Sequence, residues 1–126
     1  MSKGIRLGLF YFRNDDVVLL SASPKELSLL ADRIEQSLDK GQFVIPIHES
    51  AQVSSKNPAK LYASSSPSGD KEENAFWWQC SETTIEKLRV AASKSSEQYF
   101  DVSGSTPFLL VTCSGHYNEQ WWQTYG

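Results

Sequence analysis

The sequence predicts an α+β fold, a two-layer sandwich in which a mostly antiparallel sheet carries two helices on one face. Two segments place apolar residues at helical spacing behind a serine cap. Short apolar runs that suit strands stand before and after each of these segments. A chain of 126 residues, 40% of them hydrophobic, has room for one core, so residues 1–126 are predicted to form a single domain.

The chain opens with a predicted hairpin. Residues 5–13 form the first strand, because the aromatic residues at 10–12 favour a sheet. Asn and Asp at 14–16 are typical of a turn, since their short polar side chains bond to the nearby backbone. The apolar residues 17–20 form the second strand.

The first helix has the clearest local signals in the chain. Ser23, Pro24 and Glu26 form a capping box with a proline in the first turn. Gly41 stands just beyond the predicted end, where a left-handed residue closes many helices. The apolar residues that share one helical face are Leu27, Leu30, Ala31, Ile34 and Leu38.

The middle of the chain is less regular. Residues 42–48 alternate like a strand, and Pro46 within them indicates a sheet edge or a bulge. Residues 61–63 are predicted to form a short strand between polar stretches. The second of these stretches, around 64–74, is predicted to be a loop.

The second half predicts a further strand at 75–80, a helix behind Ser81, and strands at 99–102 and 108–112. Residues 108–112 are almost continuously apolar, which is typical of a central strand. For the aromatic segment at 117–125, the pattern favours neither a helix nor a strand. The predicted inner face of the second helix consists of Ile85, Leu88, Ala91 or Ala92, and Ser95.

The two halves can be aligned at an offset of 58 residues, which places Ser23 over Ser81. Each half then contains a strand, a serine cap, an amphipathic helix and another strand. A duplicated β-α-β unit accounts for this likeness. Any strand followed by a capped helix looks alike, however, and this generic explanation is favoured over duplication.

Charge and targeting signals restrict the class of protein. The net charge of −3 speaks against a general nucleic-acid binder, which needs clustered Lys and Arg to neutralise phosphates. We find no secretory leader and no apolar stretch near the roughly 18 residues of a membrane span, so no membrane partner is expected. The two cysteines end apolar runs, which favours reduced thiols and a cytoplasmic location.

The chemically reactive side chains form no convincing catalytic or metal pattern. Cys113 and His116 form a C-x-x-H, but Cys80 and His48 have no close partner in sequence, so no zinc site is expected. No glycine-rich phosphate motif occurs, and we expect no cofactor. Acidic pairs at 15–16 and 72–73 lie in predicted turns, where solvated carboxylates are poor acid–base catalysts. A small enzyme that uses Cys113 and His116 remains an alternative.

Two adjacent tryptophan pairs are the unusual feature of the sequence. Alternate residues of a strand face opposite sides, so one of Trp77 and Trp78 is predicted to face the helices and the other to face away. The outward ring is covered by loops, by a second copy in a homodimer, or by a partner or ligand. The candidate binding residues are Trp77, Trp78, Tyr117, Trp121, Trp122 and Tyr125.

Residues 17–34, which read VVLLSASPKELSLLADRI, resemble a strand–cap–helix element of small bacterial immunity proteins of polymorphic toxin systems. The resemblance implies a non-catalytic protein that binds and neutralises a cognate toxin, and it carries over no site residues. The main alternative is a small-ligand-binding domain with a pocket lined by Trp and Tyr.

Overall fold

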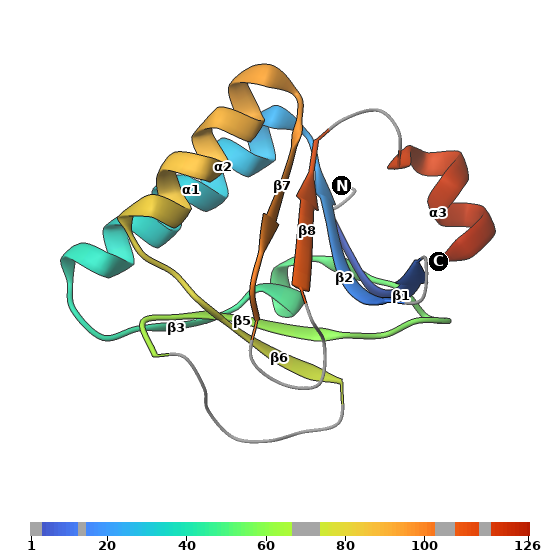
Figure 1. Cartoon of the computed structure of the whole chain (residues 1–126), viewed down its shortest axis with the longest axis horizontal. Coiled ribbons are helices and arrows are strands. Elements are labelled where there is room, and N and C mark those ends of the chain that lie inside the picture. Colours follow the sequence, from blue (N-terminus) through green and yellow to red (C-terminus); the bar gives the residue numbers. More distant parts are fainter. Residues whose placement is uncertain (1–3, 13–14, 67–73, 103–107, 114–116) are drawn as a thin grey trace.

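The computed structural model describes residues 4–12, 15–66, 74–102, 108–113 and 117–126. It confirms the α+β class. The chain builds three walls around a common core: a pair of helices, a five-stranded sheet and a three-stranded sheet (Figure 1). A further short helix lies on the opposite side of the five-stranded sheet from the helix pair (Figure 1).

The five-stranded sheet has the order β4-β1-β2-β8-β7. The predicted hairpin is confirmed, because β1 and β2 pair antiparallel over their whole length. β8 pairs parallel to β2 and antiparallel to β7, and β4 pairs parallel to β1, so the sheet is mixed. The strands are β1 (Ile5–Phe12), β2 (Asp15–Ala22), β4 (Gln52–Val53), β7 (Glu97–Phe100) and β8 (Phe108–Thr112).

The three-stranded sheet has the order β3-β5-β6. β3 (Val44–Pro46) lies at its edge, as Pro46 predicts, and the 3-10 turn η1 (Ile47–Ser50) follows directly. β5 (Lys60–Ser64) pairs antiparallel to β3 and parallel to β6 (Ala75–Gln79). The short strand expected at 61–63 is therefore the centre of a sheet.

Helix α1 (Pro24–Asp39) begins and ends where the sequence predicts. The Ser23 hydroxyl accepts a hydrogen bond from the Glu26 amide at 3.2 Å, which satisfies one of the free donors of the first turn. Gly41 has a φ of +106°, a conformation that a side chain would strain. The buried residues of α1 are Leu27, Leu30, Ala31 and Ile34.

Helix α2 (Glu82–Lys94) packs beside α1 in the helix wall (Figure 1). The Ser81 amide donates to the Thr84 hydroxyl at 3.0 Å, which fixes its first turn. The prediction that Ser95 belongs to the inner face of this helix was wrong. Ser95 adopts a left-handed conformation and ends the helix, so the inner face stops with Ala91 and Ala92.

The sequence predicts a single sheet, whereas the chain forms two mixed sheets. The strands on either side of a capped helix do not join one sheet: α1 connects β2 of the larger sheet to β3 of the smaller, and α2 connects β6 of the smaller sheet to β7 of the larger. The proposed repeat stops at the strand–helix step, because β1 and β2 pair antiparallel whereas β5 and β6 pair parallel. Most of the predicted loop at 64–74 lies outside the described residues.

Helix α3 (Glu119–Tyr125) covers the second face of the five-stranded sheet (Figure 1). Trp122 is only 4% exposed and belongs to a second apolar cluster with Phe10, Val17, Leu19 and Leu110. These sheet residues alternate with those that face the main core, so the sheet is apolar on both sides. No helix within the described residues is long and apolar enough to cross a membrane.

Replacement of Trp122 by Ala is expected to lower the free energy of unfolding by about 3–5 kcal/mol, because a buried indole leaves a large cavity. Tyr125→Ala, on the same helix, is expected to change it by less than about 1 kcal/mol, because that ring is 55% exposed. Urea unfolding measures both values. Equal losses for the two variants would show that Trp122 does not anchor the helix.

Candidate functional site

The six candidate binding residues do not form one patch. Trp77 and Trp78 belong to β6 in the three-stranded sheet, whereas the other four lie on or beside α3. Trp78 is 1% exposed within the main core, and Trp122 is buried in the second cluster. The structure therefore offers two separate aromatic surfaces rather than one.

The first aromatic surface is the outer face of the three-stranded sheet. Ile45, Ala63 and Trp78 point into the main core, so their neighbours Pro46, Tyr62 and Trp77 point outward. These three residues form one row across the sheet, and Val44 shares their side. We call Val44, Pro46, Tyr62 and Trp77 the outer aromatic face.

Its centre is a stack of two aromatic rings. The Tyr62 and Trp77 rings lie 4.6 Å apart at an interplanar angle of 15°, and both are half-buried. The His48 ring meets Tyr62 edge-on at 5.0 Å, and the His48 Nδ1 accepts a hydrogen bond from the Leu61 amide at 3.2 Å. Val44 is 54% exposed at one end of the face. None of the four residues of the face belongs to either apolar cluster.

The second aromatic surface surrounds α3 and consists mostly of packing. The Trp121 ring lies 4.9 Å from Tyr117, 5.0 Å from Phe10 and 5.1 Å from Tyr125. Trp121 and Tyr117 are half-buried against the second cluster, and only Tyr125 projects into solvent. The aromatic residues of this segment therefore serve mainly to close the second face of the sheet.

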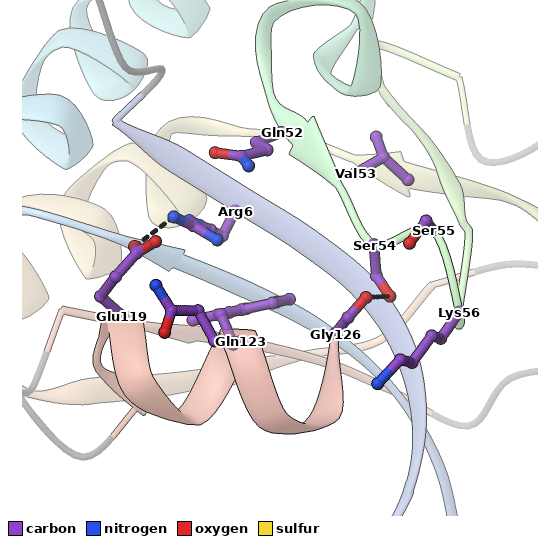
Figure 2. Close-up of a pocket in the computed structure, with 10 residues that line it drawn as sticks. Arg6, Gln52, Val53, Ser54, Ser55, Lys56, Glu119, Gln123 and Gly126 are labelled. Atoms are coloured by element: carbon purple, nitrogen blue, oxygen red, sulfur yellow. Dashed lines mark hydrogen bonds and ion pairs between the residues drawn. The ribbon is translucent and has the colours of Figure 1, made fainter.

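Polar contacts hold α3 at both ends (Figure 2). Glu119 in its first turn forms an ion pair with Arg6 of β1. At its other end the Ser54 hydroxyl donates to the Gly126 carbonyl at 2.8 Å, and the Lys56 ammonium donates to the Thr124 carbonyl at 3.3 Å. The hollow between these residues has a volume of about 400 Å³, and both cations on its wall are already engaged.

An acidic groove runs between the two long helices. Leu38 and Ile85 are the apolar residues of its wall, and the Arg89 guanidinium pairs with Asp32 at 3.0 Å and with Glu35 at 3.2 Å. The four carboxylates that line the groove outnumber this one cation: they are Glu35, Asp39, Glu82 and Glu86. The groove therefore has a negative potential that suits a basic partner.

The two thiols lie in environments that disfavour a nucleophile. The Cys113 thiol donates to the Ala91 carbonyl at 2.9 Å, and burial raises its pKa. Burial raises the pKa of Cys80 to about 12, with a smaller opposing effect from the Ser64 backbone. A reactive cysteine needs a lowered pKa and access to solvent. His116 and the acidic pair at 72–73 lie outside the described residues, which contain no group of three possible metal ligands.

Comparisons with known proteins found no matching family model, no curated protein and no solved structure with significant similarity. The site therefore has to be read from its own residues. Sequence reasoning singled out Trp77 but missed Tyr62, because the pairing of β5 with β6 cannot be seen in a five-residue strand. The acidic groove was missed for a similar reason, since its carboxylates come from two helices far apart in the chain.

The Cys113 thiol is expected to react with iodoacetamide at neutral pH far more slowly in the native protein than in denaturant, because it is buried and hydrogen-bonded. Mass spectrometry of the alkylated peptide measures both rates. A native rate equal to that of the unfolded chain would support the Cys113 enzyme alternative.

Cys80→Ala is expected to flatten the fall of stability with alkaline pH. The unfolded thiol ionises near its ordinary pKa of 9.0, whereas the native thiol keeps its proton to about 12. Between these values the native state binds more protons, so each pH unit lowers the free energy of unfolding by up to about 1.4 kcal/mol. Urea unfolding from pH 8 to 11 measures the slope. An unchanged slope in the variant would contradict this assignment.

Proposed function

We propose that this chain is a non-catalytic protein-binding domain of the immunity type, which binds a bacterial toxin domain and neutralises it. The observation that carries the proposal is the Tyr62–Trp77 stack on the outer aromatic face. Tryptophan and tyrosine dominate the energetic centres of protein interfaces, because they combine a large apolar area with few rotatable bonds.

The position of the stack supports an interface rather than a packing role. Trp77 is next to Trp78, which already supplies an indole to the main core. The outward rings lie on a rigid, hydrogen-bonded sheet with their core-facing neighbours fixed behind them. A preorganised surface of this kind loses little conformational entropy on binding.

The acidic groove supports a basic partner. Asp39 is separated from β3 by only a short connection, and Glu82 begins α2 just after β6, so the groove adjoins one end of the three-stranded sheet. A basic protein surface that meets both regions gains apolar contact from the rings and faster association from the carboxylates. A nuclease toxin, which must attract phosphates, has such a surface.

The thiol environments also support a binding protein over an enzyme. Among the described residues, both cysteines are buried, and burial raises both pKa values. A toxin inhibitor needs only a complementary surface, and its affinity depends on a few well-placed rings and charges.

The proposal expects a toxin domain to be encoded beside this chain. The test uses that domain, with affinity measured by calorimetry and protection by survival of cells that express both. Trp77→Ala is expected to weaken binding by about 30-fold, the loss typical of a buried aromatic at the centre of an interface. Glu82→Lys combined with Glu86→Lys is expected to slow association, most strongly at low salt.

Tyr125→Ala is the matched control, because it removes an exposed aromatic ring from the other surface and leaves the outer aromatic face intact. Its affinity and protection are expected to equal those of the unmodified chain. Loss of binding in Tyr125→Ala but not in Trp77→Ala would move the interface to α3. A neighbouring toxin domain that does not bind the unmodified chain would overturn the proposal.

A further inference from the structure

A hollow lies against β6, α2 and the ends of β7 and β8, with lining residues from all four elements or from the chain directly beside them. The hollow there has a volume of about 560 Å³, which is within the range of small-molecule sites. It is separate from the outer aromatic face, because Trp78 reaches it from the opposite side of β6 to Trp77. The inference therefore does not depend on the toxin proposal.

Four of the seven residues that line this hollow are aromatic. The Trp78 and Phe100 rings lie 5.1 Å apart at an angle of 57°, and both are buried. The Tyr99 and Phe108 rings meet edge-to-face at 5.5 Å at the rim of the hollow, on the opposite face of the five-stranded sheet from Phe100. Aromatic walls of this kind favour a flat apolar or aromatic ligand over a sugar or a free phosphate.

Trp78 and Lys87 both line this hollow, and neither side chain forms a hydrogen bond or ion pair within the described residues. The Trp78 indole nitrogen is one of two buried side-chain polar atoms among the described residues that have no hydrogen-bond partner. Lys87 lies over the Phe100 ring, with its ammonium 5.5 Å from the centroid. Within the described part of the chain, no carboxylate forms an ion pair with it.

The other indole without a hydrogen-bond partner is that of Trp122, which lies beside the hollow at α3. A comparison of the cations in the two hollows favours the Trp78 site. At α3 both cations are engaged, Arg6 by Glu119 and Lys56 by a backbone carbonyl. At the Trp78 site the Lys87 ammonium lies over the Phe100 ring but forms no ion pair within the described residues, so a ligand carboxylate adds a charge-assisted bond there.

We propose that the hollow lined by Trp78, Lys87 and Phe100 binds a small aromatic carboxylate. A carboxylate has two acceptor oxygens and no donor, which matches an ammonium together with an indole N–H. The aromatic body of the ligand then lies against the Phe100 ring, on the side of the sheet that faces the main core.

Asp101 lines the same hollow and, within the described residues, has no cationic partner. Its negative charge opposes that of the ligand, so it limits the affinity for a carboxylate. The charge gives the site a diagnostic property: removal of the Asp101 charge strengthens binding of an anion and weakens binding of a ligand that carries an ammonium group.

The experiment titrates the full chain, labelled with ¹⁵N at tryptophan, with benzoate and with its neutral counterpart benzamide. Benzoate is expected to shift one indole N–H resonance saturably, and benzamide to bind at least about tenfold more weakly, because it lacks the charge. Lys87→Gln is expected to weaken benzoate binding by about tenfold, and Asp101→Asn to strengthen it.

Lys94→Gln is the matched control, because Lys94 lies on the same helix but does not line the hollow, and its benzoate affinity is expected to be unchanged. These surface variants keep the indole in place, so the result does not depend on a core substitution that might unfold the chain. Three results would each overturn the proposal: no saturable shift, equal binding of benzamide and benzoate, or weaker benzoate binding in Asp101→Asn.

Discussion

Burial of β2 on both of its faces is the constraint on which the rest of the structure depends. Every residue from Val17 to Ala22 is buried, and alternate residues point to opposite sides of the sheet. Val18 and Leu20 face the main core, while Val17 and Leu19 face away from it. A sheet with two apolar faces needs a cover on each side. The helix pair and the smaller sheet cover one face, and α3 covers the other.

This constraint divides the tryptophans into packing and surface residues. Trp122 is required by the second face of β2, and Trp78 by the main core, so neither is surplus. Trp77 is the tryptophan that the core does not need, because the alternation of side chains along β6 directs it away from the core. Aromatic residues therefore indicate a binding surface only where they are not needed for packing.

The sequence was sufficient for features that depend on neighbouring residues. The Ser23 cap, the Gly41 terminus, the hairpin and the edge position of Pro46 all follow from local chemistry, and the structure confirms them. The α+β class also followed, because it needs only the order of the elements. The division into two sheets could not be predicted, because it depends on the pairing of β2 with β8, which are far apart in the sequence. The type of α3 was open because its seven residues are too few for a clear period.

The division into two sheets also explains why the outer aromatic face is a favourable place for function. The residues that point inward from β5 and β6 pack into the main core, so changes to them lower stability. Tyr62 and Trp77 belong to neither apolar cluster, so a change in these side chains does not remove an apolar residue from the core. A fold with this separation can change its partner without repacking its core, because recognition depends on side chains that the core does not need.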